Sequence, residues 1–126
     1  TGAMDFCNAG HNPPLIITIN GDSHQADNLE VESNAPLGLW PELDYVGESI
    51  DNIKGHPFFV YSDGLSEAEN EQQEQFGEER LRNILCDGHL RSAQHAVEHI
   101  MAEVEKHRGK AVPNDDLTML ALRLDE

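Results

Sequence analysis

Three aspartates stand at the ends of two apolar stretches, where their side chains could do chemistry. In "FFVYSDG" a run of strand-forming residues stops at Asp63, and in "NDDLTMLALRL" Asp115 and Asp116 come first and the apolar run follows. Antiparallel pairing of the two stretches would bring the three carboxylates to one edge of a sheet. Oxygen ligands without a Cys or His cluster suit a hard divalent cation, Mg²⁺ or Mn²⁺, better than zinc. The pattern predicts a cation site formed by Asp63, Asp115 and Asp116.

Gly64 is expected to support this site, because it would let the backbone turn sharply beneath the metal. An alternative stays open, because Asp and Gly are common in turns and Asp115 could cap a local backbone group. We interpret His11, in "AGHNPP", as a turn histidine whose ring bonds the backbone rather than as a catalytic group.

The elements that must position these residues are strands first and helices later. We expect strands in "MDFCN", "LIITI", "LEVES", "FFVYS" and "LTMLALRL" and in residues 45–50, with a hairpin turn at Asn20-Gly21-Asp22. One helix has Glu78 and Glu79 in its first turn and ends at Gly88, and a second begins after Ser92 and ends at Gly109. Both are amphipathic, so they should cover one face of a sheet. The predicted fold class is α+β, an antiparallel sheet covered by two amphipathic helices, in a single domain of residues 1–126.

The composition is strongly acidic. The chain has 24 Asp and Glu residues against 8 Lys and Arg and a formal charge of -16. This charge argues against binding nucleic acid or contacting an anionic membrane surface and favours cations and basic partners. Two cysteines in no metal-like spacing, no apolar run of about 18 residues and no signal-peptide pattern predict a soluble, cytoplasmic protein.

Five segments of the chain resemble a known enzyme family. In order and spacing, "CNAGHNPPL", "PLGL", "FFVYSDGLSEAEN", "FGEERL" and "NDDLTMLALRL" are similar to the PPM-type metal-dependent serine/threonine phosphatases, in their bacterial sporulation-protein-E-like branch. The resemblance implies part of an α-β-β-α sandwich. It matches Asp63 and Asp115 to metal-binding aspartates and Asp116 to a position that orients Asp115 or a water. It also implies a two-metal Mn²⁺ or Mg²⁺ centre that hydrolyses phosphoserine or phosphothreonine.

The resemblance implies a partner and a missing part as well. The substrate would be a phosphorylated regulatory protein of anti-anti-sigma type, in a pathway that controls a sigma factor. The family's upstream Gly-Asp and Asp-Val-Ser-Gly-His-Gly segments, which carry further metal ligands, do not occur here. We therefore expect the C-terminal portion of a phosphatase domain, cut from a longer protein and inactive alone. Strand edges left by the missing half make a homodimer plausible. The competing hypothesis is a non-catalytic regulatory or protein-interaction module on the same scaffold.

Overall fold

The structure of the chain is a computed structural model that describes residues 1–87 and 92–125. The elements are β1 (Met4–Phe6), β2 (Leu15–Asn20), β3 (Ser23–Asn28), β4 (Glu48–Ile50), β5 (Phe58–Tyr61), α1 (Asp63–Ser66), α2 (Glu78–Cys86), α3 (Ala93–Arg108) and β6 (Met119–Leu122). Gly88, which we expected to end the first long helix, lies outside the described residues. Among the described helices, none has the length and hydropathy that crossing a bilayer would require.

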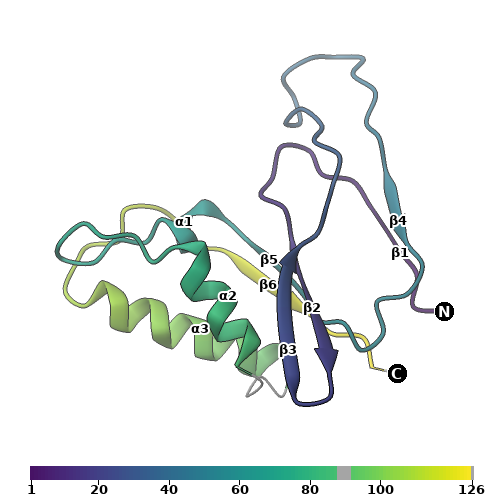
Figure 1. The fold of residues 1–126 in the computed structure, drawn as a ribbon. Helices are drawn as coiled ribbons and strands as arrows, with labels where there is room; N and C mark the ends of the chain where they lie inside the picture. The colour runs from purple at the N-terminus through teal and green to yellow at the C-terminus, as the bar shows by residue number, and fades with distance from the viewer. Residues whose placement is uncertain (88–91, 126) are drawn as a thin grey trace.

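Four strands form the larger sheet, in the order β3-β2-β5-β6 (Figure 1). All three neighbouring pairs are antiparallel. The register of β5 and β6 runs from Phe58 opposite Leu122 to Tyr61 opposite Met119, so the two aspartate-bearing stretches are neighbours as predicted. A separate two-stranded sheet pairs β1 with β4.

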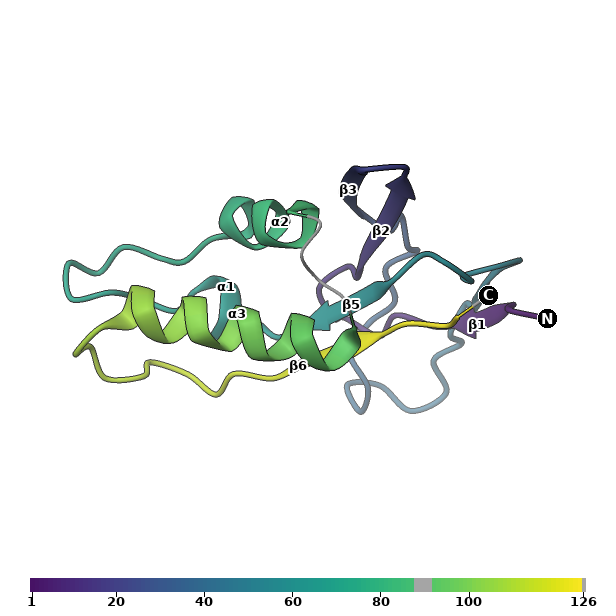
Figure 2. The same cartoon turned by 90° about the horizontal axis from the view of Figure 1, so that it is seen from below.

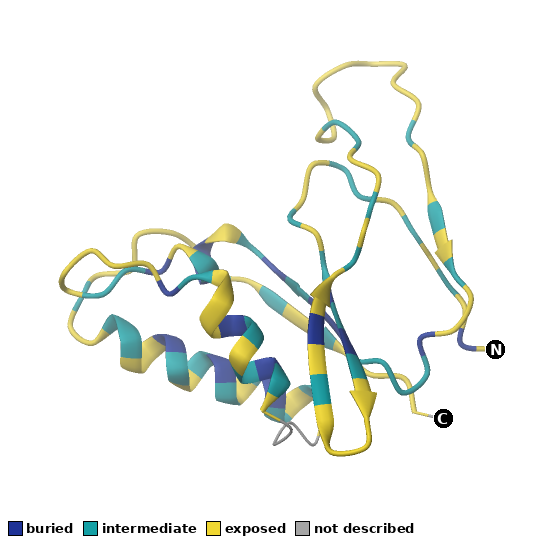
Figure 3. Cartoon of the chain, viewed as in Figure 1, coloured by how far each residue is buried: buried dark blue, intermediate teal, exposed yellow. Residues whose placement is uncertain are grey.

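The two long helices lie on one face of the larger sheet. α2 packs against β3 and α3 against β6, and Figure 2 shows α3 running beside β5 and β6. The core residues Leu15, Phe59, Leu81, Ile100 and Val104 are buried where these layers meet, and Figure 3 colours the buried parts of the ribbon dark blue. Burying one apolar face of each helix against the sheet satisfies the amphipathic pattern. The predicted α+β class is thus confirmed.

The second strand of the hairpin differs from the expectation. We expected a strand in "LEVES", residues 29–33, but β3 covers Ser23–Asn28 and residues 29–33 form no strand. The turn is so short that Asn20 already pairs with Ser23. Because β3 is an edge strand in which only Ala26 is buried, its sequence "SHQADN" is almost entirely polar. The prediction of a strand in "LEVES" was therefore wrong, because it relied on apolar residues that the real edge strand lacks.

Tyr61 fastens β5 to α2 inside the core. Its side chain is 2% exposed, and its hydroxyl donates a hydrogen bond to Glu78 Oε1 at 3.0 Å. Burial, and then the hydrogen bond and negative charge of Glu78, raises the pKa of the Tyr61 hydroxyl above its ordinary value. The folded chain therefore holds this proton more tightly than the unfolded chain does.

We expect the substitution Tyr61→Phe to alter how stability depends on pH. In the unfolded chain the phenol ionises near pH ~10, whereas the folded chain keeps its proton, so the stability that Tyr61 contributes is full below about pH 10 and falls above it. The variant should lose about 1 kcal/mol of unfolding free energy at neutral pH and show a shallower alkaline decline. Urea denaturation monitored by circular dichroism between pH ~7 and ~11 measures both effects. Tyr45→Phe is the control, and equal declines in Tyr61→Phe and the unaltered chain would contradict the expectation.

Candidate metal site

Asp63 lies at the junction of β5 and α1. We had expected a sharp turn there, but the chain forms a helix instead. Ser62 is extended, and Asp63 is the first residue of the one-turn helix Asp63–Ser66. The Asp63 side chain is exposed at this edge of the sheet.

Hydrogen bonds fasten residues 115–118 to this junction. The Ser62 N–H donates to Thr118 O at 2.9 Å, and the Thr118 N–H donates to Ser62 Oγ at 3.0 Å. The Ser62 hydroxyl donates in turn to Asp116 O at 3.4 Å. The two aspartate-bearing segments are therefore held side by side beyond the end of the β5–β6 pairing.

Gly64 lies directly against the backbone of Asp116. A Cβ added to Gly64 would stand 1.9 Å from Asp116 O and 2.7 Å from Asp116 C. Its φ is not positive, so the reason for glycine is this close approach rather than the sharp turn that the sequence suggested. The residue does support the packing of α1 against residues 115–117, for a different physical reason from the expected one.

Asn12 is a site residue that the sequence reasoning missed. Its Nδ2 donates to Asp63 Oδ1 at 2.6 Å across 51 positions of sequence. Asn8 holds the preceding turn, because its Oδ1 accepts from the His11 N–H at 2.8 Å and its Nδ2 donates to His11 O at 3.0 Å. The His11 ring contacts Asn12 O through Nδ1 at 3.1 Å, which agrees with a turn histidine. The sequence motif "NAGHN" includes Asn12 but does not indicate which of its residues contacts Asp63.

The Asp115 carboxylate is partly engaged locally. Its Oδ1 accepts from the Asp116 N–H at 2.8 Å, which is the local cap left open as an alternative. A carboxylate has two oxygens, each with two acceptor positions, so this bond is compatible with metal binding through the other oxygen. Asp115 and Asp116 are both exposed.

The residues present fit a hard divalent cation in kind but are too few. Asp63, Asp115 and Asp116 offer carboxylate oxygens, the donors that Mg²⁺ and Mn²⁺ prefer. Within residues 1–87 and 92–125, however, no group of three or more Asp, Glu, His or Cys side chains converges to hold an ion. The site as this chain builds it is therefore partial.

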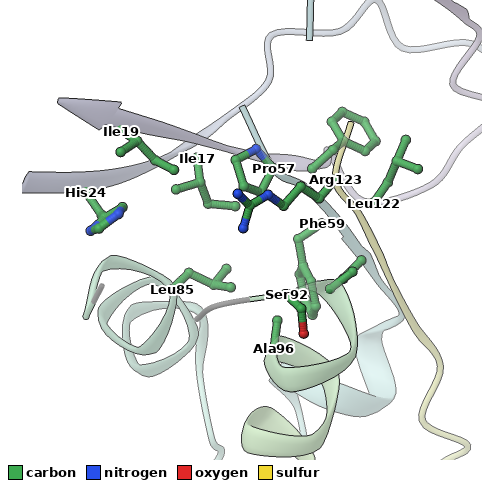
Figure 4. Close-up of a pocket in the computed structure, with 13 residues that line it drawn as sticks. Ile17, Ile19, His24, Pro57, Phe59, Leu85, Ser92, Ala96, Leu122 and Arg123 are labelled. Carbon is green, nitrogen blue, oxygen red and sulfur yellow. The ribbon is translucent and has the colours of Figure 1, made fainter. Parts of the chain in front are cut away.

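A separate hollow lies between the sheet and the two long helices. Figure 4 shows side chains of Ile17, Phe59, Leu85 and Ala96 around it. None of the three aspartates lines this hollow, and apolar side chains supply most of its walls. It does not offer the ligands of a cation site.

If Asp63 holds a cation, removing the Asn12 amide should weaken the binding of that cation. The hydrogen bond orients the carboxylate, and partners of this kind typically change metal affinity by about 10-fold to 100-fold. We expect Asn12→Ala to raise the Mn²⁺ dissociation constant at least about tenfold, measured by titration calorimetry. Asn20→Ala, at the exposed end of β2, is the matched control. Equal Mn²⁺ affinities for the two variants would contradict the role of Asn12.

A family model and a curated protein match this chain over nearly its whole length. The model of stage II sporulation protein E (SpoIIE) matches residues 1–125. Protein IcfG of Synechocystis sp. is 27% identical over 122 residues, which are 96% of this chain and 18% of that protein.

Several solved structures share the fold. The SiaA-PP2C domain of Pseudomonas aeruginosa matches with a TM-score of 0.71 and 22% identity, over 98% of this chain and 47% of that one. The RsbU and RsbW domains of Rv1364c from Mycobacterium tuberculosis give 0.72 and 24%, over 95% and 32%. The Mn-presoaked phosphatase domain of SpoIIE from Bacillus subtilis gives 0.62 and 22%, over 98% and 51%. The chain spans about half the length of these relatives or less.

Proposed function

Since the chain belongs to the SpoIIE family, we propose that its parent protein is a metal-dependent serine/threonine protein phosphatase. Residues 1–126 would be the C-terminal portion of the catalytic domain. The observation that carries the proposal is the juxtaposition of the Asp63 and Asp115-Asp116 segments through Ser62 and Thr118. It occurs in a chain with the fold of PP2C phosphatase domains.

In this proposal Asp63 and Asp115 hold Mn²⁺ or Mg²⁺. Such cations, when bound, supply a nucleophilic water at neutral pH and neutralise charge on the phosphoryl oxygens. The chain's own residues do the positioning. Asn12 orients the Asp63 carboxylate, Gly64 lets α1 approach residues 115–117, and Asp116 supports its neighbour.

The remaining ligands would come from outside this chain. Two or three carboxylates do not dehydrate and fix a pair of divalent ions, which prefer six or more oxygen ligands each. We propose that residues upstream in the parent protein complete the centre, and support comes from the greater length of the matched relatives.

We further propose that the parent acts in the cytoplasm on a phosphorylated regulatory protein of anti-anti-sigma type, and so controls a sigma factor. Support comes from the resemblance of the sequence motifs to the sporulation-protein-E-like branch. One structural relative also carries RsbU and RsbW domains in a single protein.

The test is phosphate release by the parent protein from p-nitrophenyl phosphate and from a phosphoserine peptide. We expect Mn²⁺ to stimulate release, a chelator to abolish it and added Mn²⁺ to restore it. A parent that folds, binds Mn²⁺ and releases no phosphate from either substrate would refute the enzyme and favour the non-catalytic module.

The isolated chain should bind Mn²⁺ only weakly. Because its carboxylates form a partial site, we expect a dissociation constant no tighter than about 10⁻⁴ M, the weak end of the range that calcium sites with oxygen ligands span, and no measurable phosphatase activity. Titration calorimetry of the chain beside the parent checks the difference. Tight two-site Mn²⁺ binding by the chain alone would overturn this expectation.

A further inference from the structure

The connection between β3 and β4 carries an unusual set of exposed apolar side chains. It rises away from the helices in Figure 1 and is mostly exposed in Figure 3. Within residues 35–46, here called the Trp40 loop, five large apolar side chains are exposed: Leu37 77%, Leu39 57%, Trp40 61%, Leu43 38% and Val46 47%. Large exposed apolar patches mark interaction sites, so the concentration of these side chains in one loop suggests a partner that covers them.

The base of the Trp40 loop is held closed. Asn34 Nδ2 donates to Val46 O at 3.1 Å, and Asn34 Oδ1 accepts from the Val46 N–H at 3.0 Å. Inside the loop, the Tyr45 hydroxyl donates to Pro36 O at 3.3 Å. A loop whose ends are tied in this way loses less conformational entropy when it binds a partner.

The same asparagine connects the loop to the candidate metal site. Asn34 Nδ2 donates to Asn8 O at 2.9 Å, and Ala9 and Asn34 form a β-bridge. Asn8 holds the turn at His11 by two hydrogen bonds, and Asn12, which follows His11, donates to Asp63. The Trp40 loop is therefore bonded to residues 8–12, the segment that contacts the proposed metal ligand.

The negative charge of the loop and of the whole chain distinguishes among the possible binding partners of the loop. Residues 35–46 contain Glu42 and Asp44 but neither Lys nor Arg, and the whole chain carries -16. A second copy would set these carboxylates and both net charges against one another. Nucleic acid and anionic lipid would be repelled in the same way. A protein surface with apolar residues rimmed by Lys and Arg fits both the apolar and the acidic features.

We propose that the Trp40 loop is a docking surface for the phosphoprotein substrate, which meets it with an apolar patch rimmed by basic residues. This inference rests on the proposed phosphatase function. Docking away from the phosphorylated residue raises the effective concentration of that residue at the active site. The loop thus selects protein substrates and leaves the hydrolysis of small phosphate esters unchanged.

The first test measures docking without catalysis, on the full parent protein. The probe is a fluorescein-labelled amphipathic peptide of leucine and lysine, and its partner peptide has serine in place of leucine. We expect the leucine peptide to bind more tightly by fluorescence anisotropy, and a Leu37→Ser, Leu39→Ser, Trp40→Ser triple variant to lose at least about tenfold in affinity. Val112→Ser, which removes an 84% exposed apolar side chain elsewhere, should bind like the unaltered protein. All these variants keep the same charge, so charge attraction alone cannot separate them.

The second test measures turnover. The leucine-lysine peptide is extended through a flexible Gly-Ser linker to a phosphoserine. We expect the triple variant to raise KM for this substrate about tenfold, with kcat and p-nitrophenyl phosphate hydrolysis unchanged.

The outcomes separate this inference from the proposed function. Equal binding of the two peptides, or equal effects of the triple variant and Val112→Ser, would overturn the docking surface while phosphatase activity stands. Two further results would overturn the docking surface. If upstream residues of the parent cover the loop, neither peptide binds. If a second copy covers the loop, the triple variant dissociates a dimer. A parent that binds the leucine peptide through the loop but hydrolyses neither substrate refutes the phosphatase, and with it the substrate role of the loop.

Discussion

Replacing Asp63 with Asn in the parent protein should lower Mn²⁺-stimulated phosphate release by at least about a hundredfold. A cation that neutralises charge in the transition state contributes several kcal/mol, and each 1.4 kcal/mol, roughly, is a factor of ten in rate. The amide keeps the size of the side chain but removes the negative charge. The Asn12 Nδ2 would also face a weaker acceptor than the carboxylate oxygen that it now contacts at 2.6 Å.

Asp115→Asn should have a comparable effect if both aspartates hold the cations. Asp116→Asn should cost less, because its proposed role is support. Asp22→Asn, in the exposed hairpin turn between β2 and β3, is the matched control for the loss of one negative charge. The measurements are kcat as a function of Mn²⁺ concentration and the Mn²⁺ dissociation constant of each variant. Unchanged rates in both Asp63→Asn and Asp115→Asn would refute the site assignment.

Gly64→Ala should destabilise the chain, although alanine is the better helix former. Within a helix, alanine is favoured over glycine by about 1 kcal/mol. Here the new Cβ would meet Asp116 O at 1.9 Å, and the atom that it meets is backbone held by the bonds of Ser62. Overpacking of this kind costs about 1–3 kcal/mol and sometimes more. We expect a net loss of about 2 kcal/mol in the free energy of unfolding, measured by urea denaturation with circular dichroism.

The same change should reduce the activity of the parent, because it moves residues 115–117 away from α1. A displacement of about 1 Å at a catalytic centre can cost roughly a hundredfold in rate. Gly47→Ala is the control, since a Cβ there would meet only Phe6 O at an ordinary 3.5 Å and φ is not positive. A Gly64→Ala variant as stable and as active as Gly47→Ala would show that the close approach does not hold the site together.

Local patterns predicted the elements whose side chains repeat with a clear period. The apolar runs of β2, β5 and β6 and the amphipathic faces of α2 and α3 lie where the sequence indicated them. The edge strand β3 was not predicted, because a strand with one buried residue has no alternation of apolar and polar side chains. The short helix α1 was not predicted either, since Ser-Asp-Gly is equally typical of a turn.

The sequence by itself indicated that antiparallel pairing of the two apolar stretches would bring Asp63 to the segment of Asp115 and Asp116, and the structure has that pairing between β5 and β6. The sequence also determined the acidic charge that limits the choice of partners. Only the tertiary structure decided that Asn12 holds Asp63 and that Gly64 is required by the backbone of Asp116. One of these contacts is a single hydrogen bond and the other is a close approach of two backbones, and each joins residues about fifty positions apart. Contacts of this kind produce no repeating pattern of apolar residues in a sequence. Packing decides them, because it alone determines which backbones approach closely enough to exclude a side chain.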